Sequence, residues 1–180
     1  MLAFAWGPRG RNMTLINIDE ETTYNLSQDA PAPDDGRDTF REWFVNGAFS
    51  PTNDRLIIAT SDGKLHQWTL DEMTYVGALT GAGTFHINRH TYVSSFESPL
   101  AFSPDGQLLA YSTPAGRIVV MRLEDGHILH VLPPVPGIEA AHNPWVDGTT
   151  GYELFVIRFL WDGSGLVVGR IGATTLWRCP

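Results

Sequence analysis

Cysteine is almost absent from this sequence. Cys179 is the only cysteine among 180 residues, so an internal disulfide and a cysteine-based metal cluster are both excluded. No apolar run reaches the roughly 18 residues that a membrane span requires. The first six residues are also too few, and lack the basic lead, for a secretion signal. We therefore expect no membrane span and a cytoplasmic location.

Positive charge is also scarce. The chain has 12 Lys and Arg against 20 Asp and Glu, which gives a formal net charge of −8. Phosphate binding needs clustered basic side chains, so we expect no nucleic-acid surface. The composition, 43% hydrophobic and 18% charged, is that of an ordinary folded protein rather than a disordered one.

The most regular stretch of the sequence is 101–132. Three turn signals, Pro104-Asp105-Gly106, Pro114-Ala115-Gly116 and Glu124-Asp125-Gly126, divide it into short apolar segments. Turns at such intervals predict an antiparallel meander of four strands. An isolated meander of this size is marginal in water, so we expect neighbours of the same kind.

The same pattern recurs along the chain. Ala48-Phe49-Ser50-Pro51 reappears 53 residues later as Ala101-Phe102-Ser103-Pro104, and a period near 50 indicates a solenoid, a propeller or an array. Partial copies lie at both ends, where Gly10 precedes Gly63 by 53 residues. We expect three, four, four and three strands in the successive units, within one domain over 1–180. The predicted units are 1–26, 44–80, 98–132 and 153–178.

One unit carries a recognisable motif. Residues 59–71 read ATSDGKLHQWTLD, with a turn at Asp62-Gly63 and an alternating strand that ends at Trp68. Together with the Phe-Ser-Pro-Asp-Gly turn at 102–106, this stretch resembles the blades of WD-repeat β-propellers. The resemblance implies an all-β fold of antiparallel four-stranded blades, about 3.5 blade-equivalents here, as an incomplete ring or fragment.

The units depart from the family pattern. Met121 replaces Trp68 and Ala115 replaces Asp62 in the next unit, so the polar network that such blades share is expected in one blade at most, and incompletely. We expect packing to supply the remaining stability. The structural residues implied by the resemblance and the repeat are Asp62, Trp68, Phe49, Phe102 and Phe159.

The predicted arc of blades leaves strand edges without partners. Three explanations are open: a fragment of a longer chain, a truncated or diverged frame, and a ring that another chain completes. We favour the part-propeller over a small closed ring. Self-association, or completion of the ring by another chain, belongs with these expectations.

Binding is expected in the long connectors 27–41, 81–97 and 133–152. In a propeller these connectors share one face, and long loops on a rigid scaffold commonly carry binding residues. The alternative is that their aromatic residues pack beneath their own loops. The candidate binding residues are Trp43, Phe85, His86, Arg89, His90 and Trp145.

Catalytic residues are not expected. His86 and His90 have a spacing that suits a metal pair on a helix, but the flanking residues favour extended structure and no third ligand is evident. We therefore expect no metal, no cofactor and no enzymatic activity. The favoured function is a non-catalytic scaffold that binds a protein or peptide. The alternatives are the propeller portion of a peptidase-associated or lactonase-type enzyme whose catalytic part lies elsewhere, and a structural subunit of a larger assembly.

Overall fold

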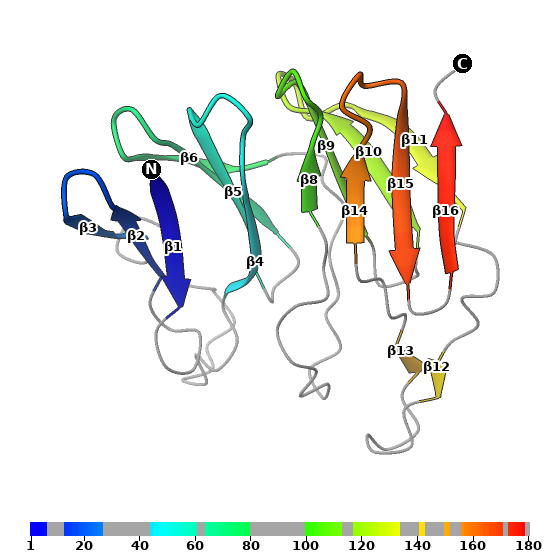
Figure 1. Cartoon of the computed structure of the whole chain (residues 1–180), viewed down its shortest axis with the longest axis horizontal. Coiled ribbons are helices and arrows are strands. Elements are labelled where there is room, and N and C mark those ends of the chain that lie inside the picture. Colours follow the sequence, from blue (N-terminus) through cyan, green and yellow to red (C-terminus); the bar gives the residue numbers. More distant parts are fainter. Residues whose placement is uncertain are drawn as a thin grey trace.

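The computed structural model describes ten segments of the chain: 1–6, 13–26, 44–60, 64–79, 100–112, 117–133, 141–142, 150–151, 156–170 and 173–178. Every regular element in these segments is a β-strand (Figure 1). In the same segments, no helix of membrane-spanning length and hydrophobicity is found. The predicted all-β fold class is confirmed.

The first two sheets occupy the N-terminal half. Sheet 1 has the order β1-β2-β3 and sheet 2 the order β4-β5-β6-β7, with every neighbouring pair antiparallel. The strands of sheet 1 are β1 (Leu2–Trp6), β2 (Met13–Asn17) and β3 (Thr22–Asn25). Those of sheet 2 are β4 (Phe44–Phe49), β5 (Arg55–Thr60), β6 (Leu65–Thr69) and β7 (Thr74–Ala78).

The other sheets follow in chain order. Sheet 3 contains β8 (Leu100–Phe102), β9 (Leu108–Ser112), β10 (Ile118–Arg122) and β11 (Ile128–Leu132). Sheet 4 contains β14 (Val156–Phe159), β15 (Gly165–Arg170) and β16 (Ala173–Arg178). The predicted succession of three, four, four and three strands is confirmed. A further antiparallel pair, β12 (Ala141–His142) and β13 (Thr150–Gly151), was not predicted.

Tight turns join successive strands within a sheet. Gly106 has φ 71° and Gly126 has φ 69°, a left-handed conformation that glycine adopts without a steric penalty. The amide of Gly106 donates to the carbonyl of Ser103 at 2.9 Å, which closes the turn between β8 and β9. The turn residues therefore set the register of each hairpin, and the apolar strands fall into place between them.

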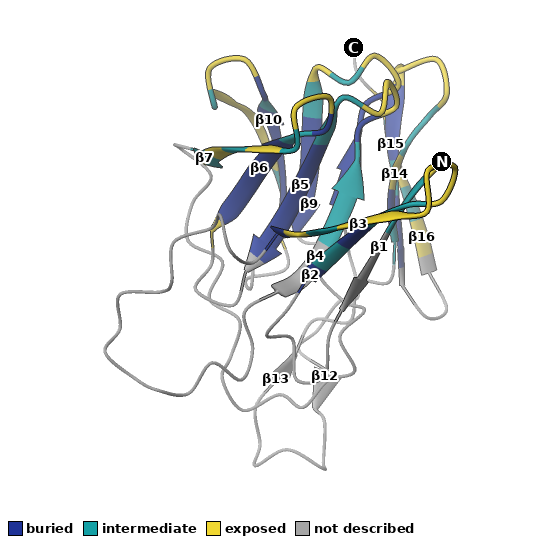
Figure 2. Cartoon of the chain, turned by 90° about the vertical axis from the view of Figure 1, so that its left-hand side faces the viewer, coloured by how far each residue is buried: buried dark blue, intermediate teal, exposed yellow. Residues whose placement is uncertain are grey.

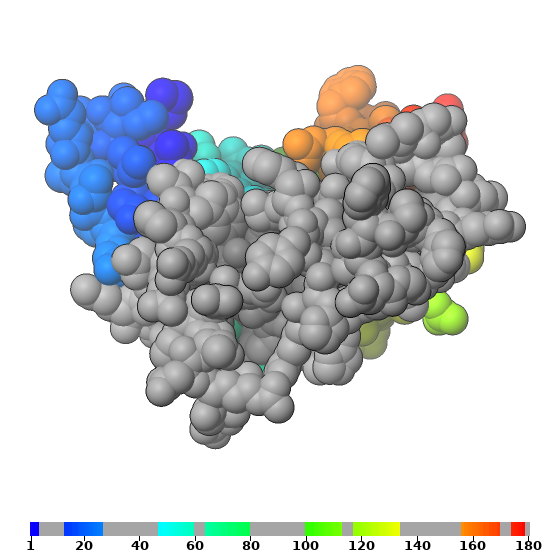
Figure 3. Space-filling view, turned by 90° about the horizontal axis from the view of Figure 1, so that it is seen from below, coloured from blue at the N-terminus to red at the C-terminus, as the bar shows by residue number. Residues whose placement is uncertain are grey.

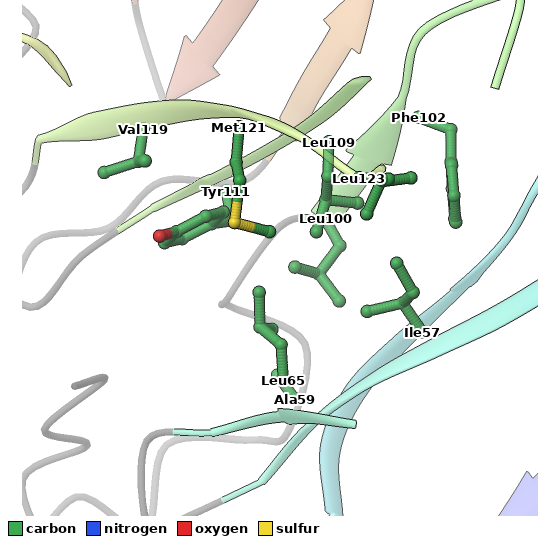
Figure 4. Close-up of a cluster of buried hydrophobic side chains, with 10 residues drawn as sticks. All are labelled: Ile57, Ala59, Leu65, Leu100, Phe102, Leu109, Tyr111, Val119, Met121 and Leu123. Carbon is green, nitrogen blue, oxygen red and sulfur yellow. The ribbon is translucent and has the colours of Figure 1, made fainter. Parts of the chain in front are cut away.

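The hydrophobic core consists of three clusters, each shared by two adjacent sheets. One cluster joins sheets 1 and 2 and contains Met13, Leu15 and Trp68. The second joins sheets 2 and 3, where ten buried side chains meet (Figure 4). The third joins sheets 3 and 4 and includes Ile118 and Val168. Each sheet is thus held by its neighbours rather than by one central core.

The four sheets are arranged in an arc. The first strands β4, β8 and β14 lie next to one another, and buried residues run along β5 and β9, whereas the turns are exposed (Figure 2). Sheets 1 and 4 form the two ends of the arc and lie on separate sides of the molecule (Figure 3). We call the end of the sheets that carries the turns 18–21, 50–54, 70–73, 103–107, 123–127 and 160–164 the turn end.

Candidate functional site

The predicted binding residues cannot be placed. Trp43, Phe85, His86, Arg89, His90 and Trp145 all lie outside the described residues, as does Asp62. The other predicted structural residues are placed in the core clusters. Phe49 packs partly buried against the cluster of sheets 1 and 2, Phe102 lies in the cluster of sheets 2 and 3, and Phe159 packs against the cluster of sheets 3 and 4.

Trp68 is fully buried and faces sheet 1. Its ring lies 5.1 Å from the ring of Tyr75 and 6.2 Å from that of His66, measured between centroids. The hydroxyl of Tyr75 and Nδ1 of His66 are 2.8 Å apart, within hydrogen-bonding distance. The indole N–H of Trp68 has no hydrogen-bond partner, because Leu56 and Ile58 of the same cluster are aliphatic. This side chain therefore acts through packing.

An open groove of about 790 Å³ lies between sheets 2 and 3 at the turn end. Its lining comes from the turn after β4 and from β6 and β7 on one side, and from the turns after β8 and β10 on the other. A smaller groove, of about 350 Å³, occupies the equivalent place between sheets 1 and 2. The lining residues of the larger groove are Thr52, Asp54, Arg55, Gln67, Thr69, Val76, Ala78, Leu79, Asp105, Gly106, Gln107, Arg122, Leu123, Glu124, Asp125 and Gly126.

The turn after β4 forms the first wall of this groove. The hydroxyl of Ser50 donates to Asp54 at 2.6 Å and accepts the amides of Asp54 and Arg55 at 3.2 and 3.0 Å. The hydroxyl of Thr52 donates to the same carboxylate. These hydrogen bonds, from Ser50 first and then Thr52, hold the pKa of Asp54 below its usual value. The carboxylate is fixed and ionised, so this wall is rigid.

The turn after β10 forms the opposite wall. Nε and Nη2 of Arg122 donate to the two oxygens of Asp125 at 3.0 and 2.6 Å, which is bidentate geometry. The guanidinium and, after it, the amide of His127 lower the pKa of Asp125 to about 2. In the neighbouring turn, the Ser103 hydroxyl and then the Gln107 amide also lower the pKa of Asp105. Both carboxylates remain charged under ordinary conditions.

The Arg122–Asp125 pair predicts a specific loss of stability in acid. Because the pKa of Asp125 is lowered on folding, its contribution is present above a pH of about 4 and is lost as the pH falls towards about 2. The variant Asp125→Asn lacks that contribution at every pH. We expect the difference in urea midpoint between the parent protein and Asp125→Asn to be constant above a pH of about 4 and to vanish below a pH of about 2. A difference that does not change with pH would contradict this assignment.

The floor of the groove mixes apolar and hydrogen-bonding groups. Val76 is 58% exposed on β7, the outer strand of sheet 2, and Ala78 follows on the same face. Gln67 of β6 is buried at 8% exposure and brings an amide to the same surface. An apolar strip beside an amide, between walls of fixed charge, suits an extended protein segment better than a small reactive molecule.

The described residues that line the groove include neither serine, cysteine nor histidine, so these residues do not include the usual pairing of such a nucleophile with a histidine base. Among the described residues, no group of three potential metal ligands converges. Three carboxylates of the groove, those of Asp54, Asp105 and Asp125, are held by hydrogen bonds within turns or by the ion pair with Arg122.

Sequence reasoning missed this groove. Its lining residues are separated by up to about 70 positions in the chain, and they meet only because sheets 2 and 3 pack side by side. The available signal was the repeat itself, which places Ser50 and Ser103 at equivalent positions before equivalent turns. Both hydroxyls organise a turn that reaches the groove.

Comparison with known proteins identifies the fold and nothing finer. No family model matches the chain, and no curated protein matches it. A chain from a solved structure described as the crystal structure of a mitotic checkpoint complex is similar, with a TM-score of 0.61 and 14% sequence identity. The similarity covers 93% of this chain and 41% of that chain.

These figures support a β-propeller-like fold. Sheets 1 to 4 are antiparallel and have three or four strands each, as in partial propeller blades. The chain spans about two fifths of the length of that solved chain. In all, 1134 solved chains match the fold, and so common an architecture does not define a function.

Proposed function

We propose that the chain is a non-catalytic interaction scaffold of WD-repeat type that binds a protein or peptide partner. The observation that carries the proposal is the groove between sheets 2 and 3, with its rigid charged walls and its apolar floor. Sites on fixed elements hold their geometry without an ordering cost when a partner binds. The groove is therefore preorganised for recognition.

The repeat type is supported by where the motif falls. Its strand residues lie on β5 and β6, and Trp68 stands near the end of β6 in the core between two sheets. The same position in the next unit, Met121, is also fully buried. The motif thus coincides with the packing that joins neighbouring blades, which is what the WD-repeat proposal requires.

The charges of the groove favour a cationic partner segment. The lining carries the carboxylates of Asp54, Asp105, Glu124 and Asp125 against the guanidiniums of Arg55 and Arg122. Complementary charge contributes mainly to specificity and to the rate of association. The apolar contact with Val76 on the floor is expected to contribute more of the affinity, since it buries surface that is now exposed.

A random peptide library displayed on phage and selected against the purified chain tests this proposal. We expect enriched peptides to be extended sequences with at least one Lys or Arg beside an apolar residue. Val76→Asp should weaken their binding by at least about tenfold, because it places a charge on the apolar floor. Val131→Asp is the matched control, because Val131 is 50% exposed on the outer strand of sheet 3 and lies outside the groove.

The same selection separates the groove from the connectors. If Trp43→Ala, His86→Ala or Trp145→Ala abolishes binding while Val76→Asp does not, the partner binds at the connectors, and the groove assignment is wrong. A selection that enriches no peptide above background would contradict the scaffold function itself. Isothermal titration with a synthetic copy of one enriched peptide gives the affinities.

A further inference from the structure

Each end of the arc presents a sheet face that no described residue covers. In sheet 4, Phe159, Leu166 and Trp177 are cross-strand partners and pack towards sheet 3. The adjacent row, Arg158, Val167 and Leu176, must point the other way because side chains alternate along a strand. Leu176 is 45% exposed, and both Arg158 and Arg178 are exposed.

Sheet 1 has the corresponding outward face. Leu15 and Tyr24 are cross-strand partners that pack towards sheet 2. The next row, Ala3, Ile16 and Thr23, therefore faces away from sheet 2. This face carries no charge in that row, but the turn that follows β2 at the turn end carries three exposed carboxylates, those of Asp19, Glu20 and Glu21. Asp19 pairs with the N-terminal ammonium of Met1 in the same chain, so Glu20 and Glu21 supply the negative charge that remains for another molecule.

We propose that a second copy of this chain covers these faces. In this arrangement, sheet 4 of each copy packs on sheet 1 of the other, and a twofold axis relates the copies. The two end contacts are then identical, and the pair of arcs closes into one ring.

The packing already present predicts which residues meet at the new contact. The groove between sheets 2 and 3 is lined by Thr69, the last residue of β6, and by Glu124 in the turn after β10. The groove between sheets 1 and 2 is lined in the same way by Asn17 at the end of β2 and by Asp71. In both grooves the strand-end residue is neutral and the residue of the next sheet's turn is acidic.

At the proposed contact, the residue at the strand end is basic rather than neutral. Arg178 ends β16 at the turn end and would lie across from Asp19 and Glu20 of the other copy. Asp162, beside Arg178, offsets part of the positive charge of Arg178. The turn after β2 still carries the negative charges of Glu20 and Glu21. The first strand of sheet 4 also has a basic residue in place of a neutral one. Arg158 of β14 stands at the position that the buried Ala101 occupies in β8. The outward face of sheet 4 is therefore suited to an acidic neighbour.

Light scattering coupled to size-exclusion chromatography measures the mass directly. We expect about twice the 19.9 kDa of one chain. Leu176→Asp should give the monomer, because it places a charge in the apolar row of the face that the other copy would cover. Val76→Asp is the matched control. Val76 is also an exposed apolar strand residue, but it lies on β7 within the arc, so this variant should remain a dimer.

Charge reversal tests the pairing of the two ends. Arg178→Glu, and separately the double variant Asp19→Arg with Glu20→Arg, should each weaken the dimer by at least about tenfold. All three changes in one chain should restore it, because the charges are exchanged. The equivalent reversal in sheet 2, Asp71→Arg with Glu72→Arg, should have no such effect.

Several results would overturn this inference. They are a monomer at all chain concentrations, a species larger than the dimer, or a dimer that Leu176→Asp and Arg178→Glu leave intact. Far-ultraviolet circular dichroism establishes that each variant is folded, so that a loss of folding is not taken for dissociation. Val76→Asp separates the two proposals, because it should weaken peptide binding in the groove and leave the mass of the dimer unchanged.

Discussion

Replacement of Trp68 by alanine is expected to lower the free energy of unfolding by about 3–5 kcal/mol, the usual cost of deleting a large buried aromatic side chain. Trp68 is 0% exposed in the cluster that joins sheets 1 and 2. The surrounding side chains belong to two paired sheets whose hydrogen bonds restrict collapse into the cavity. The effect should therefore lie near the upper part of that range.

Trp161 provides the control for this measurement. It is 88% exposed in the turn after β14, and Trp161→Ala should change the unfolding free energy by less than about 0.5 kcal/mol. Trp68→Phe should cost less than Trp68→Ala, because phenylalanine keeps an aromatic ring in the cluster and leaves a smaller cavity. Urea unfolding at one fixed chain concentration gives the values. Equal losses for Trp68→Ala and Trp161→Ala would show that the cluster contributes little.

Two glycines of β15 are expected to respond to alanine in different ways. A Cβ at Gly165 would lie 2.5 Å from the backbone carbonyl oxygen of Trp177, whereas a Cβ at Gly169 would lie 2.7 Å from a methyl group of Val156. Both substitutions overfill the sheet and should cost about 1–3 kcal/mol. Gly165→Ala should cost more, because the strand β16 itself must move.

The compensating variants distinguish the two causes. Gly169→Ala combined with Val156→Ala should recover most of the stability lost by Gly169→Ala, because the methyl group in the way is removed. Gly165→Ala combined with Leu160→Ala should recover none, since the carbonyl oxygen remains although the Leu160 side chain is gone. Urea unfolding of the parent, the four single variants (Gly169→Ala, Val156→Ala, Gly165→Ala and Leu160→Ala) and the two double variants gives both coupling energies. Equal recovery in the two pairs would contradict this explanation.

The turns and the repeat made most of the fold predictable. Two sequences, Pro104-Asp105-Gly106 and Glu124-Asp125-Gly126, consist of residues that favour turns. The structure has a turn at each of them. The period of 53 residues then predicted four strands for 44–80 as well, and four strands are found there. Local chemistry sufficed here because antiparallel neighbours are also neighbours in the chain.

The N-terminal unit departs from the repeat by one residue. An offset of 53, which aligns Gly10 with Gly63 and Arg11 with Lys64, places Leu15 at the position of Trp68, which faces the preceding sheet. Leu15 instead faces the following sheet and packs in the same cluster as Trp68. A shift of one residue reverses the face of every side chain in a strand. Two aligned residues were too few to show this shift.

The groove and the pair β12–β13 could not be predicted for a different reason. Asp54 and Arg122 line the same surface, but only the angle and spacing between two packed sheets bring them there. The strands Ala141–His142 and Thr150–Gly151 have two residues each, so no periodicity can form. Such features depend on tertiary packing rather than on local residue preference.

The three shared clusters also determine how stability is distributed along the chain. Since each cluster joins only two adjacent sheets, the protein behaves as a one-dimensional series of nearest-neighbour couplings. Sheets 2 and 3 are coupled on both sides, whereas sheets 1 and 4 are coupled on one. Fraying therefore starts at the ends of the series and moves inward, and whatever contacts an end sheet raises the cooperativity of the whole array.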